Sequence, residues 1–329
     1  MQSDVMKRRE FIALLTGAAA AWPLAARAET KVLQVGFLYP GPEPAAKPRM
    51  AAFISGLQEV GLRVPDQVSL VPRVAAGDPN KLAPMAAELA SQKVDLIMAV
   101  SPAAIRAAMA ATKTIPIVGD DLESDPVAAG FVTSIAHPGG NLTGVFMDFP
   151  DFTKKWLEAL KEARPDLAKI AVFWDPATGK FQQSAIRAAA DVFHVQIETF
   201  EMRGPADAKT AFAESGKRGM DAVVILSSPF VGANTKLLAD LALAQHLPAV
   251  TMFPDFARNG GLMAYGPNLL AFFDQAGVMA GKILKGAHPS DLPVESPTKF
   301  EFVLNLRTAK EIGISIPTSL LLRATDVIE

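Results

Sequence analysis

Cysteine is absent from this sequence of 329 residues. The chain therefore forms no disulfide bond and has neither a thiolate metal site, a cysteine nucleophile nor a cysteine that could carry a lipid anchor. An excess of either charge is also missing, because 32 Lys and Arg residues nearly balance 34 Asp and Glu residues. The net charge of −2 argues against nucleic acid as the main partner, since contacts to phosphates need a basic surface.

Signatures of common enzyme classes are missing too. The chain has no Gly-x-Ser-x-Gly turn, no glycine-rich phosphate loop and no His-Glu-x-x-His helix. Its four histidines lie in unrelated segments, at His137, His194, His246 and His288. We therefore expect a protein that is not an enzyme and that uses no cofactor and no metal ion.

The first 28 residues contain the three regions of an export signal. Residues 7–9 are Lys-Arg-Arg, residues 11–21 are an apolar stretch too short to cross a bilayer of about 30 Å, and residues 26–28 are a small-x-small cleavage site. The run Arg-Arg-Glu-Phe-Ile at residues 8–12 resembles the twin-arginine export signal. We expect a signal peptide over residues 1–28, export to the periplasm and a mature chain that does not span the membrane.

From residue 32 onward, short apolar runs rich in Val and Ile alternate with longer runs of helical spacing. Most short runs are apolar on both faces, as are strands of a parallel sheet covered by helices. The alternation predicts an α/β fold with doubly wound parallel sheets, and this many strands favours two lobes over a single sheet. The predicted strands are residues 32–38, 68–74, 94–100, 115–118, 142–147, 170–174, 195–200, 222–226, 249–252 and 262–265.

Three interruptions of this alternation predict crossings between the lobes. They are residues 148–151, the pair Gly266-Pro267, and the segment 286–297, which is rich in Pro, Ser and Gly. Three crossings would make a three-segment hinge. The expected lobes are residues 29–147 with 268–292, and residues 148–267 with 293–329.

Four predicted strand-to-helix turns share a Ser or Asp followed by Pro. In open α/β sheets, ligands bind beyond the carboxyl ends of the strands, and helix N-termini there suit a carboxylate or phosphate. Helix capping explains each turn taken alone, but four of them at the same edge of two sheets favour a ligand-binding cleft. The turns are Ser101-Pro102, Ser124-Asp125-Pro126, Asp175-Pro176 and Ser227-Ser228-Pro229.

Aromatic side chains stand at similar positions. The two tyrosines of the chain, Tyr39 and Tyr265, lie at the ends of predicted strands, as do Trp174 and Phe253. Such side chains give a ligand apolar area and, for Tyr and Trp, a hydrogen-bonding group. Ordinary core packing is the alternative explanation for each of them.

One loop is strongly acidic. Asp120, Asp121, Glu123 and Asp125 follow the strand that is predicted to end at Val118. They could hold a cation or the ammonium group of a ligand, or they could form a solvated loop. Asp125 is the best single candidate for a ligand contact, because it also stands at a helix-capping position.

Several longer blocks carry a family resemblance. With them, nearly the whole mature chain resembles the bacterial ABC-transporter substrate-binding proteins of the tryptophan/tyrosine-binding type, which have a type I periplasmic-binding fold. The blocks are Ala-Gly-Asp-Pro at 76–79, Thr-Ile-Pro-Ile-Val at 114–118, Ser-Asp-Pro-Val-Ala-Ala-Gly at 124–130, His-Pro-Gly-Gly-Asn-Leu-Thr-Gly at 137–144, Gly-Gly-Leu-Met-Ala-Tyr-Gly-Pro at 260–267, Lys-Ile-Leu-Lys-Gly at 282–286, Pro-Thr-Lys-Phe-Glu at 297–301 and Asn-Leu-Arg-Thr-Ala-Lys at 305–310.

The resemblance implies import rather than catalysis, with a small molecule held between the lobes and an ABC permease of the inner membrane as partner. Two positions depart from the family. Asp120-Asp121 stands where relatives usually carry small or apolar residues, and Ser101-Pro102 stands where many have a Gly-Thr-Pro-like turn. Carried over by position, the ligand contacts implied by the resemblance are Tyr39, Ser101, Asp125, Trp174, Ser227 and Tyr265.

Taken together, these features predict a periplasmic solute-binding protein of an ABC importer. We expect a monomer that captures an amino acid or a related small carboxylate by hinge closure. Two alternatives stay open: a ligand-sensing module for a receptor, and a two-lobed enzyme. The sequence offers no acid–base constellation for the enzyme, while the fold alone does not separate an importer from a sensor.

Overall fold

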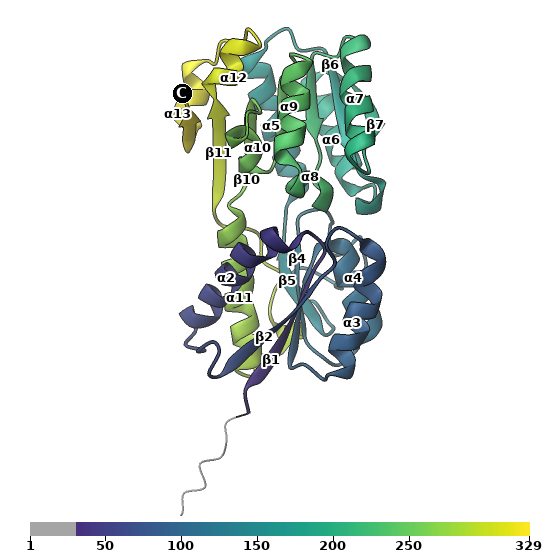
Figure 1. Ribbon diagram of the computed structural model, residues 1–329, viewed down its shortest axis with the longest axis vertical. Coiled ribbons are helices and arrows are strands. Elements are labelled where there is room, and N and C mark those ends of the chain that lie inside the picture. The colour runs from purple at the N-terminus through teal and green to yellow at the C-terminus, as the bar shows by residue number, and fades with distance from the viewer. Residues whose placement is uncertain (1–30) are drawn as a thin grey trace, which may run out of the picture. The chain divides into compact units, whose positions relative to one another are not determined.

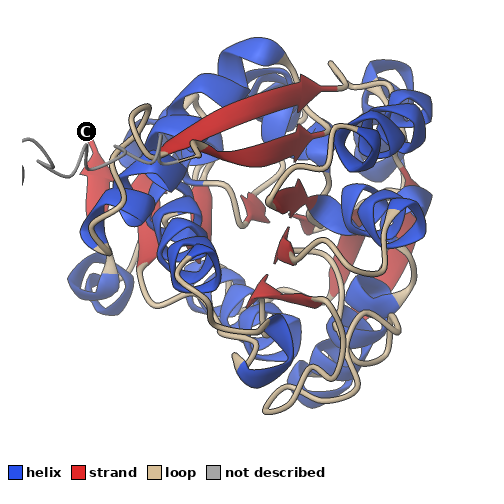
Figure 2. Cartoon of the chain, turned by 90° about the horizontal axis from the view of Figure 1, so that it is seen from below, coloured by secondary structure: helices blue, strands red, loops and turns tan. Residues whose placement is uncertain are grey.

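The computed structural model describes residues 31–329, so the expected signal peptide lies outside the described residues. The described chain forms two α/β lobes, each built around its own sheet (Figure 1). Helices cover the sheets, as Figure 2 shows with helices in blue and strands in red. Within residues 31–329, no helix is both long and apolar enough to cross a membrane.

The first lobe contains a five-stranded sheet in the order β2-β1-β3-β4-β5, with every neighbouring pair parallel. Its strands are β1 (Leu33–Tyr39), β2 (Val68–Val74), β3 (Leu96–Val100), β4 (Ile117–Asp121) and β5 (Leu142–Phe146). Its helices are α2 (Glu43–Glu59), η1 (Pro79–Lys81), α3 (Leu82–Ser91), α4 (Ser101–Ala111) and α11 (Leu269–Leu284).

Alternate side chains of these strands pack toward opposite faces of the sheet. Phe37 lies in one buried cluster with Phe53 of α2 and Phe272 of α11. Leu38, the next residue in β1, lies in a second cluster with Leu82 of α3. Both faces of the sheet are therefore apolar, as expected for a doubly wound sheet.

The second lobe contains a seven-stranded sheet in the order β12-β11-β10-β9-β8-β6-β7. Its strands are β6 (Lys169–Trp174), β7 (Gln196–Glu201), β8 (Ala222–Ile225), β9 (Ala249–Thr251), β10 (Met263–Pro267), β11 (Phe300–Asn305) and β12 (Asp326–Ile328). Its helices are α5 (Phe149–Ala163), η2 (Pro176–Thr178), α6 (Phe181–Phe193), α7 (Pro205–Lys217), α8 (Pro229–Ala233), α9 (Thr235–Ala244), α10 (Pro254–Arg258), α12 (Leu306–Glu311) and α13 (Thr318–Arg323).

The ten predicted strands are confirmed within a few residues at each end, while β11 and β12 were not predicted. β11 also departs from the parallel pattern, because it runs antiparallel to β10. After β10 the chain builds α11 on the first lobe and then returns through residues 285–299, which include η3 (Pro289–Asp291). No helix of the second lobe lies between β10 and β11. β11 therefore has no crossover helix packed on its own sheet, such as usually joins parallel neighbours, and it pairs antiparallel to β10.

The return segment also packs on the first lobe. Val294 is buried in the cluster that contains Leu38, and Glu295 forms a β-bridge with Val145 of β5. The Thr143 hydroxyl donates a hydrogen bond of 2.8 Å to the backbone carbonyl of Leu292. The segment is therefore held along the edge of the first sheet before it reaches β11.

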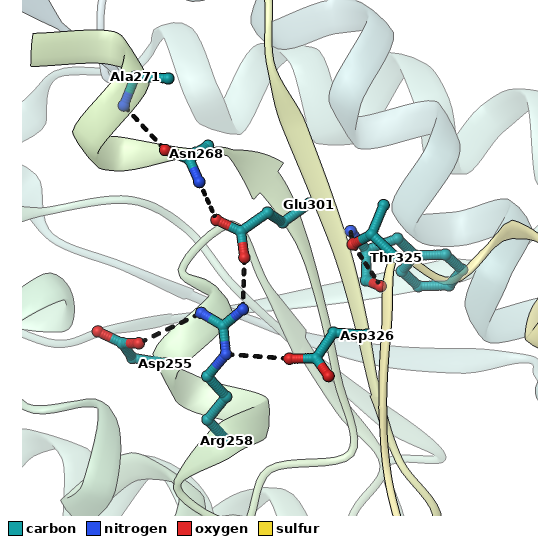
Figure 3. Close-up of polar contacts among 8 residues, drawn as sticks. Asp255, Arg258, Asn268, Ala271, Glu301, Thr325 and Asp326 are labelled. Atoms are coloured by element: carbon teal, nitrogen blue, oxygen red, sulfur yellow. Dashed lines mark hydrogen bonds and ion pairs between the residues drawn. The ribbon is translucent and has the colours of Figure 1, made fainter. Parts of the chain in front are cut away.

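A charged cluster holds the passage from β10 into α11 (Figure 3). Asn268 caps α11 by accepting a hydrogen bond of 2.8 Å from the Ala271 N–H, and its side-chain amide donates one of 2.7 Å to Glu301 of β11. Glu301 in turn accepts from Arg258 of α10, which also pairs with Asp326 at 3.2 Å. Three elements of the second lobe thus fix the first turn of α11.

Candidate functional site

A cavity with about 490 Å³ of empty space lies at the carboxyl ends of the strands, with walls from both lobes. The first lobe supplies Tyr39 at the end of β1, Arg49 from α2, Ser101 at the start of α4, and Asp120 and Glu123 at and after the end of β4. The second lobe supplies its wall from α8 and the end of β9, with the side chains Ser228, Pro229 and Phe253. This is the edge at which open α/β sheets bind ligands.

Ser101 occupies a strained position in this wall. Its φ angle is 80°, in the left-handed region, where a residue with a Cβ atom is disfavoured by roughly 1–2 kcal/mol. Its hydroxyl is buried, and no hydrogen-bond partner for Ser101 Oγ exists among residues 31–329. The sequence predicts Ser101 as the N-cap of a helix, but Val100 takes the N-cap position and Ser101 is the first residue of α4. Strain and an unpaired buried hydroxyl in one residue are features of a ligand-binding position.

The acidic segment is buried, so the solvated loop considered from the sequence is wrong for its first three carboxylates. β4 continues to Asp121, and Asp120, Asp121 and Glu123 are each at most 5% exposed. The Ser227 hydroxyl of the second lobe donates a hydrogen bond of 2.8 Å to Glu123 Oε1. Asp120 Oδ2, in contrast, has no partner anywhere in the part of the chain that the structure describes.

Burial raises the pKa of all three carboxyl groups. The pKa of Asp120 is well above its ordinary value through burial and the nearby Asp121 carboxylate, with Arg49 opposing the rise. Burial and then the Asp121 carboxylate raise the pKa of Glu123 in the same way. Burial raises the pKa of Asp121 to about 6, against hydrogen bonds that lower it. An ammonium group placed at Asp120 would favour the ionised carboxylate there.

Arg49 provides the positive charge of the cavity. Its guanidinium carbon lies 5.6 Å from the Tyr39 ring centroid and 5.9 Å from the Phe273 ring centroid, within range for cation–π attraction. Burial raises the pKa of Tyr39, so its phenol stays neutral at physiological pH. One face of the cavity therefore combines a cation with two aromatic rings, which suits a carboxylate beside an apolar group.

The structure brings three of the six predicted ligand residues to this site. Tyr39 and Ser101 line the cavity. Ser227 is fully buried beside it, where it contacts Glu123 and where its N–H donates a hydrogen bond of 2.8 Å to Gln182 Oε1. These three residues lie at the ends of β1, β3 and β8, as the strand-end argument predicts.

The other three, Asp125, Trp174 and Tyr265, lie outside the set of residues that line this cavity. Asp125 accepts hydrogen bonds of 2.8 Å from the N–H groups of Val127 and Ala128, so it caps a single turn and no helix follows. It lines a different cavity, together with Asp148 from the passage into α5.

Trp174 and Tyr265 have structural contacts of their own. The Trp174 indole N–H donates a hydrogen bond of 2.7 Å to the Gly179 carbonyl. The Tyr265 ring stacks on Phe152 at a centroid distance of 5.3 Å, and the Tyr265 backbone carbonyl accepts a hydrogen bond of 2.7 Å from the indole N–H of Trp156. Both aromatic residues thus hold the second lobe together.

Sequence reasoning missed Arg49 and Phe273. Arg49 immediately precedes the apolar stripe of a predicted helix, and an arginine at such a position is expected to be exposed to solvent. Phe273 lies more than 200 residues later in the chain, and only the packing of α11 against α2 brings the two together. Among the described residues, no group of three or more His, Cys, Asp or Glu side chains is placed to hold a metal ion.

Comparisons with known proteins agree with a binding site. The chain is 25% identical over 274 residues to the tyrosine-binding protein of Clostridioides difficile, which covers 82% of this chain and 78% of that protein. Its fold matches a solved ABC domain in complex with L-Trp from Streptococcus pneumonia, with a TM-score of 0.83 and 25% identity over 90% of this chain and 99% of the other. It also matches a conserved domain protein from Vibrio cholerae, with a TM-score of 0.84 and 23% identity over 90% of this chain and 100% of the other.

The family assignment rests on a match over most of the chain. Residues 39–328 match the family model for ABC transporter substrate binding proteins, and this range contains every residue of the cavity and both lobes except for most of β1. The two mainly parallel sheets and the cavity between their carboxyl ends have the arrangement in which open α/β sheets bind small molecules. The chain therefore belongs to the ABC transporter substrate-binding proteins.

Proposed function

We propose that the chain is the exported solute-binding protein of an ABC importer and that it captures an amino acid in the cavity between its lobes. One observation carries the proposal. The cavity contains the cationic Arg49, the unpaired hydroxyl of Ser101 and the unpaired carboxyl oxygen of Asp120, next to the Tyr39 and Phe273 rings. An amino acid has a matching group for each of these features.

The ligand's carboxylate would bind near Arg49, the Ser101 hydroxyl and the N-terminus of α4, where backbone N–H groups are free. Its ammonium would bind Asp120 and Glu123, and its side chain would contact the aromatic rings. The names of two relatives, a tyrosine-binding protein and a domain in complex with L-Trp, support an aromatic amino acid as the first candidate.

Capture would proceed by hinge closure. The hinge would comprise residues 147–148, the Pro267-Asn268 passage and residues 296–299, which are the places where the chain passes between the elements of the two lobes. The Glu123–Ser227 hydrogen bond would close the cleft beside the ligand. Only a ligand that contacts both lobes can favour the closed form, because equal affinity for both forms shifts nothing. We further propose that the closed monomer delivers the ligand to a permease and catalyses no reaction.

We also propose export through the signal peptide at residues 1–28, which has the order of regions that secretion requires. N-terminal sequencing of protein from the periplasmic fraction is expected to begin close to Glu29. Changing Arg8 and Arg9 together to lysine is expected to block export by the twin-arginine route. Periplasmic protein that retains residues 1–10 would contradict export by cleavage, and unimpaired export of the lysine variant would indicate the general secretory route.

Ligand binding can be tested by thermal denaturation of the mature protein with each of the twenty standard amino acids. An aromatic amino acid at 100 times its Kd is expected to add about 2.7 kcal/mol to the free energy of unfolding, which raises the melting temperature by several degrees. The aliphatic amino acids are expected to raise it less, because they leave the aromatic walls partly uncovered. A flat response to all twenty would contradict the proposal.

A further inference from the structure

A second, wider chamber adjoins the ligand cavity. It contains about 1310 Å³ of empty space and shares four lining residues with the cavity: Pro40, Gly41, Ser101 and Pro229. Because both spaces touch these residues, they lie next to each other around Ser101. An extension of a ligand in the cavity would enter the chamber past these residues.

The chamber is walled mainly by apolar residues with little conformational freedom. The first lobe contributes Pro42, Pro79, Leu82 and Pro102, and the second lobe contributes Phe230 among others. Proline rings have a fixed φ angle and lose no side-chain rotamers when a ligand covers them. The chamber is thus preorganised to contact an apolar group, which reduces the entropic cost of binding.

Apart from Ser101, which it shares with the cavity, the polar side chains of the chamber have hydrogen bonds or ion pairs inside the protein. Asp175 accepts a hydrogen bond of 2.9 Å from the Ala177 N–H, and the Thr178 hydroxyl donates one of 2.8 Å to the Asp175 carbonyl. The Asn234 amide donates one of 2.8 Å to the Phe230 carbonyl, and Arg203 pairs with the carboxylates of Glu201 and Asp207. A polar extension of the ligand would lose its hydrogen bonds to water here and find few replacements.

We infer that this chamber is a subsite for an apolar extension of the ligand. The inference rests on the proposed function: the amino-acid head group occupies the cavity, and the chamber takes an extended aromatic or alicyclic group on its side chain. The chamber is larger than the cavity, so the compact head group of the ligand is assigned to the cavity and the apolar extension to the chamber. A peptide is a poorer candidate than an aryl-substituted amino acid, because its amide groups would be buried unpaired.

L-phenylalanine and 4-phenyl-L-phenylalanine are the probes for this inference, since they differ by one terminal ring. Calorimetric titration of the mature protein is expected to give about 10- to 100-fold tighter binding for the longer ligand, from the apolar area that the second ring buries. Ala103→Phe, which fills the chamber from α4, is expected to weaken binding of the longer ligand at least tenfold and to leave L-phenylalanine within about twofold.

Two further variants keep the test decisive. Ala177→Phe fills the same chamber from the second lobe and is expected to repeat the result, so a folding defect of one variant does not decide the outcome. Ala110→Phe adds the same ring to an exposed position of α4 and is expected to change neither affinity. The subsite would be overturned, and the proposed function left intact, if the wild type bound the two ligands with equal affinity. The same conclusion would follow if Ala103→Phe and Ala177→Phe lowered the affinity for both ligands by the same factor. If the wild type bound neither ligand, the subsite and the proposed binding of aromatic amino acids would both be overturned.

Discussion

Asp120→Asn is expected to weaken binding of the preferred amino acid by about 100-fold and, at the same time, to stabilise the ligand-free protein. The affinity falls because the ligand's buried ammonium loses its charged partner, which typically costs 2–5 kcal/mol. The stability rises because burial makes the ionised form of Asp120 costly in the absence of a ligand. Substitution of a residue that only stabilises the fold would instead lower both the stability of the protein and its affinity for the ligand.

The pH dependence follows from the raised pKa of Asp120. In the unfolded chain its carboxyl ionises near pH 3.8, whereas in the folded protein it keeps its proton to higher pH. The folded state therefore binds more protons above pH 3.8, and the free energy of unfolding falls as pH rises through this range. Asp120→Asn removes that contribution, so its stabilising effect is expected at pH 7 and is expected to disappear below about pH 3.5.

Denaturant unfolding at several pH values and calorimetric titration measure the two effects. Asp125→Asn is the matched control, because Asp125 lines another cavity and an amide oxygen can still accept the N–H groups of Val127 and Ala128. Its affinity for the ligand is expected to stay within about twofold of the wild type. Full affinity in Asp120→Asn, or an equal loss in both variants, would show that the ammonium binds elsewhere.

Gly56→Ala is expected to destabilise the protein by about 3 kcal/mol, although alanine is normally the better helix former by about 1 kcal/mol. A Cβ atom on Gly56 of α2 would lie 1.9 Å from the backbone carbonyl oxygen of Asp274 in α11. In the same interface, a Cβ atom on Gly277 would lie 2.1 Å from the Phe53 carbonyl oxygen. Backbone atoms cannot turn away as side chains do, so the two helices must separate.

Separation of these helices is also expected to weaken ligand binding, because α2 carries Arg49 and α11 carries Phe273. Thermal and denaturant unfolding measure the stability, and titration measures the affinity. Gly216→Ala in α7 is the control, since the nearest atom to its added Cβ is the end of the flexible Gln245 side chain. We expect this control to be neutral or slightly stabilising. A Gly56→Ala protein as stable as the wild type would contradict the close packing of α2 and α11.

The strands were predictable from the sequence because most of them are buried over most of their length. Runs such as Leu96–Val100 and Ala222–Ile225 are short, apolar and flanked by helical spacing, and they lie where the pattern places them. β11 and β12 were missed for local reasons. β11 follows a proline-rich return segment without a helix of its own lobe, and β12 is only three residues long.

The candidate site was predictable only in part. The rule that ligands bind beyond strand ends led to Tyr39 and Ser101, because their strands could be identified. The same rule gives no information about Arg49 or Phe273, which reach the cavity from helices. Asp120 was noticed for its charge, but the distinction between a solvated loop and a buried strand end depends on how far β4 extends. That extension is set by its pairing with β5, which local sequence does not encode.

Small-angle X-ray scattering of the mature protein, with and without a saturating aromatic amino acid, tests the capture mechanism most directly. If the ligand bridges Asp120 of the first lobe and the α8 wall of the second, it must favour the form in which both surround the cavity. Capture by closure of the lobes predicts a smaller radius of gyration with ligand, and no decrease in Asp120→Asn at the same ligand concentration. Tight binding of one ligand per chain with an unchanged radius would contradict capture by closure of the lobes.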